Sequence, residues 1–195
     1  MLNDQAERLQ KILLCGDREA AAALAKACSP EILLRKNHVL RSLTDQYREG
    51  SVPFCQLTAA CEAAAMFYDA SLPPVACCGA VRGNTCPTGR DFMMMLLRGW
   101  GVPAVDLGTD TAPETFVAAI RRHQLRFVIC TAFSQDDLAT VRQLHELAKA
   151  EGLRDSFSLL LSGINPEPSH GVLPLDYQEH SAAQVAEWVV NAWNS

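Results

Sequence analysis

The stretch VRGNTCPTGRDF, residues 81–92, places one cysteine in a glycine-bounded turn between an apolar run and an amphipathic run. Cys86 would lie just before the N-terminus of a helix, whose dipole lowers the pKa of a thiol and favours the thiolate. A thiolate can act as a nucleophile, and as a soft donor it can ligate a soft or borderline metal ion. The position in the loop does not by itself decide between these functions and a structural cysteine.

Known phosphate-binding and nucleophile motifs do not match this loop. A P-loop requires Gly-x-x-x-x-Gly-Lys-[Ser/Thr], whereas Gly83 and Gly89 are separated by five residues and followed by Arg90. The dinucleotide fingerprint Gly-x-Gly-x-x-Gly and the nucleophile elbow Gly-x-Ser-x-Gly are also absent. A cysteine phosphatase would need an arginine where this chain has Phe92.

No sequence feature pairs Cys86 with a general base. We interpret four histidines as surface residues: His123, His145, His170 and His180. The chain has eight cysteines, with no Cys-x-x-Cys pair and no zinc-like spacing to the histidines. All except Cys86 are interpreted as reduced thiols packed among apolar side chains, namely Cys15, Cys28, Cys55, Cys61, Cys77, Cys78 and Cys130.

Composition narrows the class of protein. The chain has 195 residues, of which 49% are hydrophobic and 20% charged, as in a globular protein with one or two domains. The formal net charge of -5 argues against nucleic acid and anionic membranes as partners. No signal peptide is recognisable at the polar N-terminus, and no apolar segment approaches the ~18 residues of a membrane span. We therefore expect a cytoplasmic protein.

Residues 1–72 are predicted to form a four-helix bundle. Gly16 ends the first helix, Asp17 caps the second, and Ser29 caps the third. The fourth helix is alanine-rich and is predicted over residues 53–70. Short connections between the helices favour an antiparallel bundle.

Residues 73–195 alternate between strand and helix patterns. Strands are predicted at 75–81, 104–107, 127–133, 157–163 and 172–175, and helices at 89–101, 115–123, 138–152 and 181–193. Apolar strands without alternation predict an α/β domain with a Rossmann-like (flavodoxin-like), doubly wound parallel sheet of about five strands. Ligands bind such sheets beyond the carboxyl ends of the strands, which directs attention to loops 82–89, 108–112, 132–136 and 162–171.

Four stretches resemble the corrinoid proteins of methyltransferase systems and the cobalamin-binding module of methionine synthase. The most specific is VPAVDLGTDTAPETFVAAI, residues 102–120, which is very close to the family's V-x-D-L-G-x-D-x-x-P-E-x-F-V-x-A run. The others are YREGSVPFCQLTAACEAA at 47–64, VICTAF at 128–133 and EGLRDSFSLLLSGINP at 151–166. The resemblance extends along nearly the whole chain.

In that family the loop after the first strand reads Asp-x-His-x-x-Gly, and its histidine is the lower ligand of cobalt. Residues 84–89 here read Asn-Thr-Cys-Pro-Thr-Gly, so asparagine and cysteine replace the aspartate and the histidine. The resemblance implies that Cys86 is the residue that could ligate cobalt. It also implies that small residues make room for the nucleotide tail of the cofactor, namely Gly89, Thr131, Ser162 and Gly163.

The resemblance gives the helical half a role as well, because in the resembling proteins the bundle covers the upper, reactive face of the corrin. The helix around Leu57 to Met66, with Phe54 at its start, would do so here. The complete set of residues implied to line the cofactor is Phe54, Leu57, Asn84, Thr85, Cys86, Pro87, Thr88, Gly89, Thr131, Ala132, Phe133, Ser162 and Gly163.

Three interpretations of the altered loop stay open. Corrinoid binds with Cys86 or water at its lower face; corrinoid binds with no protein ligand; or the site binds nothing and the fold serves as a regulator or scaffold. We expect a cobalamin-binding methyl-group carrier without a histidine ligand, working with partner methyltransferases and a reductive activator rather than as a stand-alone enzyme. The alternatives are a cobalamin sensor or scaffold, and a cysteine-dependent enzyme on the same fold.

Overall fold

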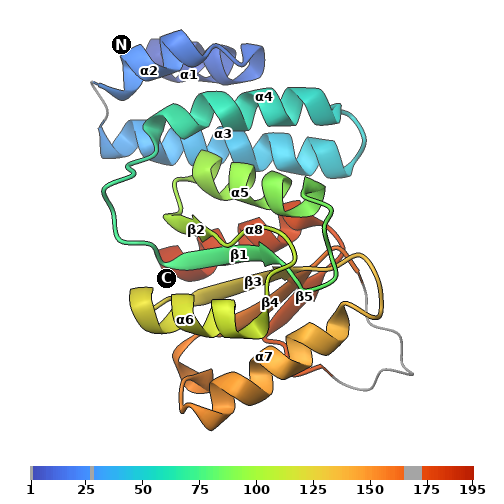
Figure 1. Ribbon diagram of the computed structural model, residues 1–195. Helices are drawn as coiled ribbons and strands as arrows, with labels where there is room; N and C mark the ends of the chain where they lie inside the picture. Colours follow the sequence, from blue (N-terminus) through green and yellow to red (C-terminus); the bar gives the residue numbers. More distant parts are fainter. Residues whose placement is uncertain (1, 27–28, 165–172) are drawn as a thin grey trace. The chain divides into compact units, whose positions relative to one another are not determined.

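The computed structural model describes residues 2–26, 29–164 and 173–195, which form two compact units (Figure 1). The helical unit comprises Met1–Ser71 and Met95–Val102, and the α/β unit comprises Leu72–Met94 and Pro103–Ser195. The division therefore falls at the start of the proline-containing stretch SLPP, residues 71–74. Helix α5 (Thr88–Trp100) contributes its first half to one unit and its second half to the other.

The helical unit contains α1 (Leu2–Cys15), α2 (Arg18–Ala25), α3 (Pro30–Arg48), α4 (Phe54–Ala64) and the 3-10 turn η1 (Ala65–Phe67). Both expected N-terminal caps are present: Asp17 Oδ1 accepts from Ala20 N at 2.9 Å, and Ser29 Oγ accepts from Ile32 N at 3.3 Å. Helix α4 packs closely against the turn between α1 and α2, since a Cβ added to Gly16 in that turn would lie 2.8 Å from Ala59 Cβ. The small side chains of α4 make this approach feasible.

The fourth helix is shorter than predicted from the sequence. It ends at Ala64 and continues only as the 3-10 turn to Phe67, whereas the alanine-rich pattern predicted helix as far as residue 70. Asp69 is the physical reason, because its Oδ1 accepts from both the backbone N–H and the hydroxyl of Ser71, at 2.9 and 2.6 Å. This local turn competes with the helical ladder.

The α/β unit contains β1 (Ala76–Ala80), β2 (Ala104–Asp106), β3 (Phe127–Thr131), β4 (Ser158–Ser162) and β5 (Tyr177–Glu179), together with α6 (Pro113–His123), α7 (Leu138–Ala150), the 3-10 turn η2 (Arg154–Ser156) and α8 (Ala182–Asn194). All pairings are parallel, in the order β2-β1-β3-β4-β5. Helices α6 and α7 lie on one face of the sheet and α8 on the other (Figure 1). The predicted doubly wound fold is confirmed.

The last strand is displaced from the predicted position at 172–175, whose first residue lies outside the described residues. Leu173 is buried and precedes Pro174, which lacks the N–H that a strand needs, so the chain turns there and Leu175 N donates to Leu173 O. The strand begins at Tyr177, which pairs with Leu160.

None of the helices within the described ranges combines the length and the apolar character needed to cross a lipid bilayer.

Candidate functional site

The carboxyl ends of β1 and β3 form the topological switch point of the sheet. Strand β1 lies between β2 and β3, so the connections that leave β1 and β3 diverge to opposite sides. Loop 82–89 follows β1, and Ala132 and Phe133 follow β3. The structure thus brings together two of the loops that the sequence marked as candidates.

Asn84 fastens loop 82–89 to β3. Its side chain is buried, its Nδ2 donates to the Thr131 carbonyl at 3.3 Å, and its Oδ1 accepts from the Cys86 N–H at 3.0 Å. The Thr131 carbonyl also accepts from Val81 N at 3.2 Å. An amide can donate and accept at once, whereas an ionised carboxylate only accepts. The asparagine in this loop therefore has a structural role that an ionised aspartate could not fill.

Asp110, in the loop after β2, holds loop 82–89 from the other side of β1. Its Oδ1 accepts from Gly83 N at 2.8 Å and its own N–H donates to the Asn84 carbonyl at 2.9 Å. Asp110 has φ of 51°, a left-handed conformation that aspartate tolerates better than most residues. Asp110 belongs to the stretch 102–120 but was not among the predicted site residues, although a polar turn residue after a strand was the available signal.

Cys86 is exposed at this edge of the sheet, with Sγ 3.5 Å from Thr88 Oγ1. The Thr88 hydroxyl, followed by the Thr88 backbone N–H at the start of α5, lowers the pKa of the Cys86 thiol below its usual range. Desolvation of the thiolate, followed by the negative charge of Asp91, opposes this lowering of the pKa. The direction agrees with the sequence-based expectation, but the larger cause is one side-chain hydroxyl. The neighbouring Thr85, Pro87 and Thr88 are exposed as well.

A cradle of small residues lies beside the loop. A Cβ added to Gly89 would lie 3.1 Å from Phe133 Cζ and 3.7 Å from Thr131 Cβ. Gly163 has φ of 109°, and its added Cβ would lie 2.4 Å from the Ala132 carbonyl oxygen. Neither position accommodates a larger side chain without movement of its neighbours.

Thr131 presents an unusual polar group to this cradle. The residue is only 2% exposed, and its Oγ1 is buried without a hydrogen-bond partner among the described residues. Buried hydroxyls are normally hydrogen-bonded, and each exception calls for an explanation such as a ligand or water. Ser162 is also buried, and its carbonyl accepts from Ala132 N at 3.0 Å. Phe133 remains 48% exposed.

A second interaction outside the predicted site residues fixes the start of α5. Arg90 Nη1 contacts Asp106 Oδ1 and Oδ2 at 2.7 and 2.6 Å, and Asp106 Oδ1 also accepts from Gly108 N at 2.9 Å. The first turn of α5 is therefore tied to the end of β2. Neither Arg90 nor Asp106 was among the site residues predicted from the sequence.

The two predicted site residues of the helical unit differ in exposure. Leu57 is fully buried in the core, whereas Phe54 is 47% exposed and its ring centroid lies 6.1 Å from that of Tyr47. The sequence pattern could not distinguish these positions, because both belong to the same alanine-rich helix.

The other cysteines and histidines depart in part from the sequence-based interpretation. Cys61, Cys77, Cys78 and Cys130 are buried and free, and burial raises the pKa of Cys61 and Cys130 to about 12. The packed-thiol interpretation is wrong for Cys15 and Cys55, which are exposed because one ends α1 and the other occupies the first turn of α4. Cys28 lies outside the described residues.

His180 is exposed, as expected, and His123 is half-buried. The surface interpretation of His145 is wrong in part, because Arg154 Nε donates to its Nδ1 at 3.0 Å and the side chain is only 19% exposed. His170 lies outside the described residues. Within residues 2–26, 29–164 and 173–195, no group of three or more His, Cys, Asp or Glu side chains could hold a metal ion.

Comparison with solved structures shows which proteins share this fold. The structure superposes on a cobalamin-binding protein from Desulfitobacterium hafniense with a TM-score of 0.73 and 17% identity, covering 98% of this chain and 92% of the other. The methanol:cobalamin methyltransferase complex MtaBC from Methanosarcina barkeri gives a TM-score of 0.73 at 16% identity, over 94% and 78%. These comparisons establish a shared fold.

Comparison of the sequence is more specific. Trimethylamine corrinoid protein 2 from Methanosarcina mazei is 25% identical over 166 residues, which cover 75% of this chain and 76% of that protein. A trimethylamine corrinoid protein from Methanosarcina barkeri is 27% identical over 85 residues, or 44% of this chain and 39% of that protein. No family model matches the chain. The resemblance to corrinoid proteins that the motifs indicated is confirmed.

Proposed function

We propose that this chain binds a corrinoid and carries a methyl group for a partner methyltransferase. The proteins similar in sequence are named corrinoid proteins. One solved structure with the same fold is a methanol:cobalamin methyltransferase complex. These names describe the relatives and support the same function here.

The observation that carries the proposal is the buried Thr131 hydroxyl without a partner among the described residues. Thr131 lies at the switch point, where its carbonyl accepts from Asn84 and its Cβ lies 3.7 Å from a Cβ added to Gly89. A nucleotide tail needs a narrow slot between backbones and polar groups along it. Gly89, Thr131, Ala132, Ser162 and Gly163 would hold that tail, and the residues present therefore fit the cofactor.

A bound corrinoid would supply a cobalt centre that accepts and releases methyl groups. We propose that Cys86 is the side chain this protein offers to that metal, because it is exposed and its thiol pKa is lowered. Asn84 would hold the Cys86 backbone, and Thr88 would stabilise the thiolate. A soft thiolate suits a soft or borderline metal.

The role at the corrin that the sequence resemblance implies for Phe54 stays a prediction; its aromatic side chain is half exposed on α4. Leu57 is not proposed for that role, because its side chain is fully buried. A reductive activator, implied by the sequence resemblance, stays a prediction.

The test is a visible spectrum of the purified full chain after incubation with hydroxocobalamin and removal of free cofactor. We expect corrin absorbance to stay with the wild-type protein and with Cys86→Ala. The band positions should differ between the two, because the metal loses its thiolate in the variant. Cys15→Ala is the matched control: it removes an exposed thiol outside the site and should leave the spectrum unchanged.

Absence of corrin absorbance in wild-type protein would contradict the proposal as a whole. Retained absorbance with identical spectra for wild type and Cys86→Ala would contradict only the role of Cys86 and leave corrinoid binding intact. A spectral change in Cys15→Ala would show that free thiols react with the cofactor in solution, and Cys86 would then lose its special role.

A further inference from the structure

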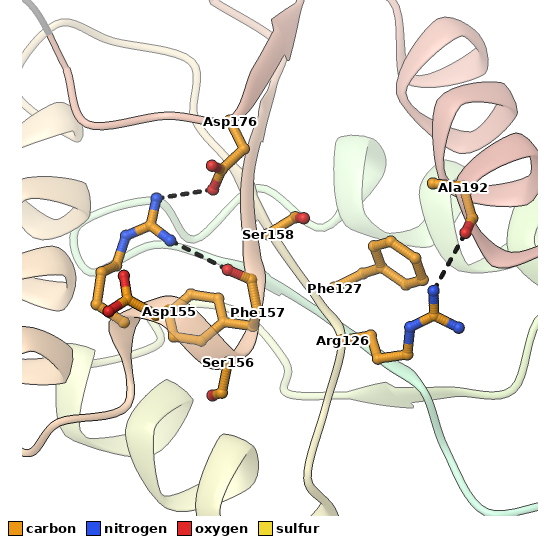
Figure 2. Close-up of a pocket in the computed structure, with 9 residues that line it drawn as sticks. Arg126, Phe127, Asp155, Ser156, Phe157, Ser158, Asp176 and Ala192 are labelled. Carbon is orange, nitrogen blue, oxygen red and sulfur yellow. Dashed lines mark hydrogen bonds and ion pairs between the residues drawn. The ribbon is translucent and has the colours of Figure 1, made fainter. Parts of the chain in front are cut away.

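A polar cavity of about 440 Å³ lies at the edge of the sheet opposite to the candidate site. It opens at the amino ends of β3 and β4, beside η2 and the last turn of α8 (Figure 2). The sheet register pairs Phe127 with Ser158 at this edge and Thr131 with Ser162 at the other. The two edges are four residues apart along each strand, or about 13 Å at ~3.3 Å per residue.

Arg154, one of the two arginines that line the cavity, has hydrogen-bond partners within the α/β unit. Arg154 Nη2 contacts Asp176 Oδ2 at 2.7 Å and the Pro174 carbonyl at 3.1 Å, and its Nη1 donates to the Phe157 carbonyl at 3.0 Å. Its Nε donates to His145, as described above. Arg154 and Asp176 therefore neutralise each other and hold η2 against the chain before β5.

The other two charged side chains of the cavity, Arg126 and Asp155, form no ion pair with a described residue. Among the described residues, the Arg126 guanidinium makes one hydrogen bond, from Nη2 to the Ala192 carbonyl at 3.2 Å, and lies 5.3 Å from the centroid of the Phe127 ring. Asp155 makes no hydrogen bond or ion pair with any described residue. Figure 2 shows Arg126 and Asp155 on opposite sides of Phe157.

We propose that this cavity binds a small zwitterion of the ω-amino carboxylate class. Its carboxylate would pair with Arg126, its ammonium group with Asp155, and its hydrocarbon chain would cross the cavity beside Phe157. A simple anion would pair with Arg126 but be repelled by Asp155. A simple cation would pair with Asp155 but be repelled by Arg126. A ligand with both charges pairs with Arg126 and Asp155 at once. Hydrogen bonds between charged groups are among the stronger ones in proteins. This inference is independent of corrinoid binding.

The test is isothermal titration calorimetry of the full chain with a length series of probes: glycine, 4-aminobutanoate, 6-aminohexanoate and 8-aminooctanoate. We expect one length to bind most tightly, because only a chain that spans from the Arg126 guanidinium to the Asp155 carboxylate can engage both charges. Hexanoate and hexylammonium carry the same chain with one charge removed. Each should bind at least about tenfold more weakly than the best zwitterion, given the energy of a charged hydrogen bond.

Two variants locate the site. Arg126→Gln and Asp155→Asn each remove one charge with little change in shape, and each should weaken the best zwitterion at least about tenfold. Arg82→Gln, at an exposed arginine of the opposite edge, is the matched control and should leave the affinity unchanged.

Three results would overturn the proposal. Binding of hexanoate as tight as that of the zwitterion would make the cavity an anion site. Unchanged affinity in both Arg126→Gln and Asp155→Asn would place the ligand elsewhere. Failure of every probe to bind wild-type protein would show that the cavity takes no ligand of this class. The single-charge probes need only wild-type protein, so the answer does not depend on whether a variant folds.

Discussion

The Asn84 side chain reaches the Thr131 carbonyl across 47 residues of sequence, with Nδ2 and the carbonyl oxygen 3.3 Å apart, and so joins the loop after β1 to the end of β3. The same amide accepts from the Cys86 N–H at 3.0 Å. One buried side chain thus fixes both the position of the loop and the backbone of its cysteine.

Asn84→Asp should weaken this arrangement in a pH-dependent way. One oxygen of the new carboxylate would keep the Cys86 N–H as its donor, but the oxygen that replaces Nδ2 would face the Thr131 carbonyl with no donor between them. When the carboxylate is ionised, this arrangement costs about 1–3 kcal/mol of unfolding free energy. Burial would raise the folded-state pKa of the new carboxyl above its unfolded value. The loss of unfolding free energy should therefore be small below the unfolded-state pKa of the new carboxyl group. It should grow as the pH rises from that value through the folded-state pKa.

Urea denaturation between pH 4 and 8 measures this effect. Asn84→Ala removes both hydrogen bonds without adding a charge and should lose stability by an amount that does not depend on pH in this way. A pH-independent loss for Asn84→Asp would contradict the role of the amide as a donor.

Thr88→Val should make Cys86 less reactive. The Thr88 hydroxyl is the main cause of the lowered thiol pKa, so its removal raises that pKa and reduces the thiolate fraction near neutral pH. Iodoacetamide labelling of Cys86 at about pH 7.5 should slow by about threefold, because the thiolate is the reactive form. The measurement needs a background in which the exposed Cys15 and Cys55 are replaced by alanine. Equal rates would show that α5 itself, and not this hydroxyl, sets the thiol pKa.

Thr131→Val separates ligand binding from folding. Valine fills the same space and removes a buried hydroxyl that has no partner in the described chain, so the unfolding free energy should stay equal or rise by about 1 kcal/mol. Corrinoid affinity should fall about tenfold if that hydroxyl contacts the cofactor. Thr140→Val, at another buried threonine of the α/β unit, is the matched control for affinity. A variant that loses stability but binds normally would mean that Thr131 is only structural.

Asp110 offers a test of loop positioning through graded substitutions. Asp110→Asn keeps an acceptor for Gly83 N and tolerates the positive φ of this position. Asp110→Gly loses the acceptor but still tolerates the positive φ, and Asp110→Ala loses both. Unfolding free energy should fall in that order, with Asp110→Ala losing about 2 kcal/mol. Thermal denaturation of the three variants checks the order. If Asp110→Gly were as stable as Asp110→Asn, the hydrogen bond to Gly83 would contribute nothing.

Gly163→Ala should be among the most damaging single changes in the cradle. The new Cβ would lie 2.4 Å from the Ala132 carbonyl oxygen at a φ of 109°, which combines a clash with backbone strain. We expect a loss of about 3 kcal/mol in urea denaturation. Gly108→Ala is the control, because Gly108 also has positive φ, 84°, but no atom within 4 Å of an added Cβ. That variant should lose only about 1 kcal/mol, and equal losses would remove the argument for close packing.

Local patterns in the sequence were sufficient for the elements of the fold. Ser29 and Asp17 cap helices because a short polar side chain before an apolar-periodic run serves as an acceptor for free N–H groups. The continuous apolar runs at β1 and β3 required strands buried on both faces, and hence a parallel sheet under helices. The exact end of α4 and the start of β5 escaped prediction, because hydrogen bonds from Ser71 to the Asp69 carboxylate and the turn at the buried Leu173 decide them.

The candidate site divides in the same way. Loop 82–89, Thr131 and Gly163 could be selected from sequence motifs, because the carboxyl ends of parallel strands meet at one edge of a sheet. Tertiary structure alone decided that Asn84 bonds to Thr131, that Asp110 holds Gly83, and that the Thr131 hydroxyl is left without a partner in the described chain. The physical reason is that strand order and register choose which distant residues become neighbours, and a pattern of residue types along the chain contains no record of that pairing.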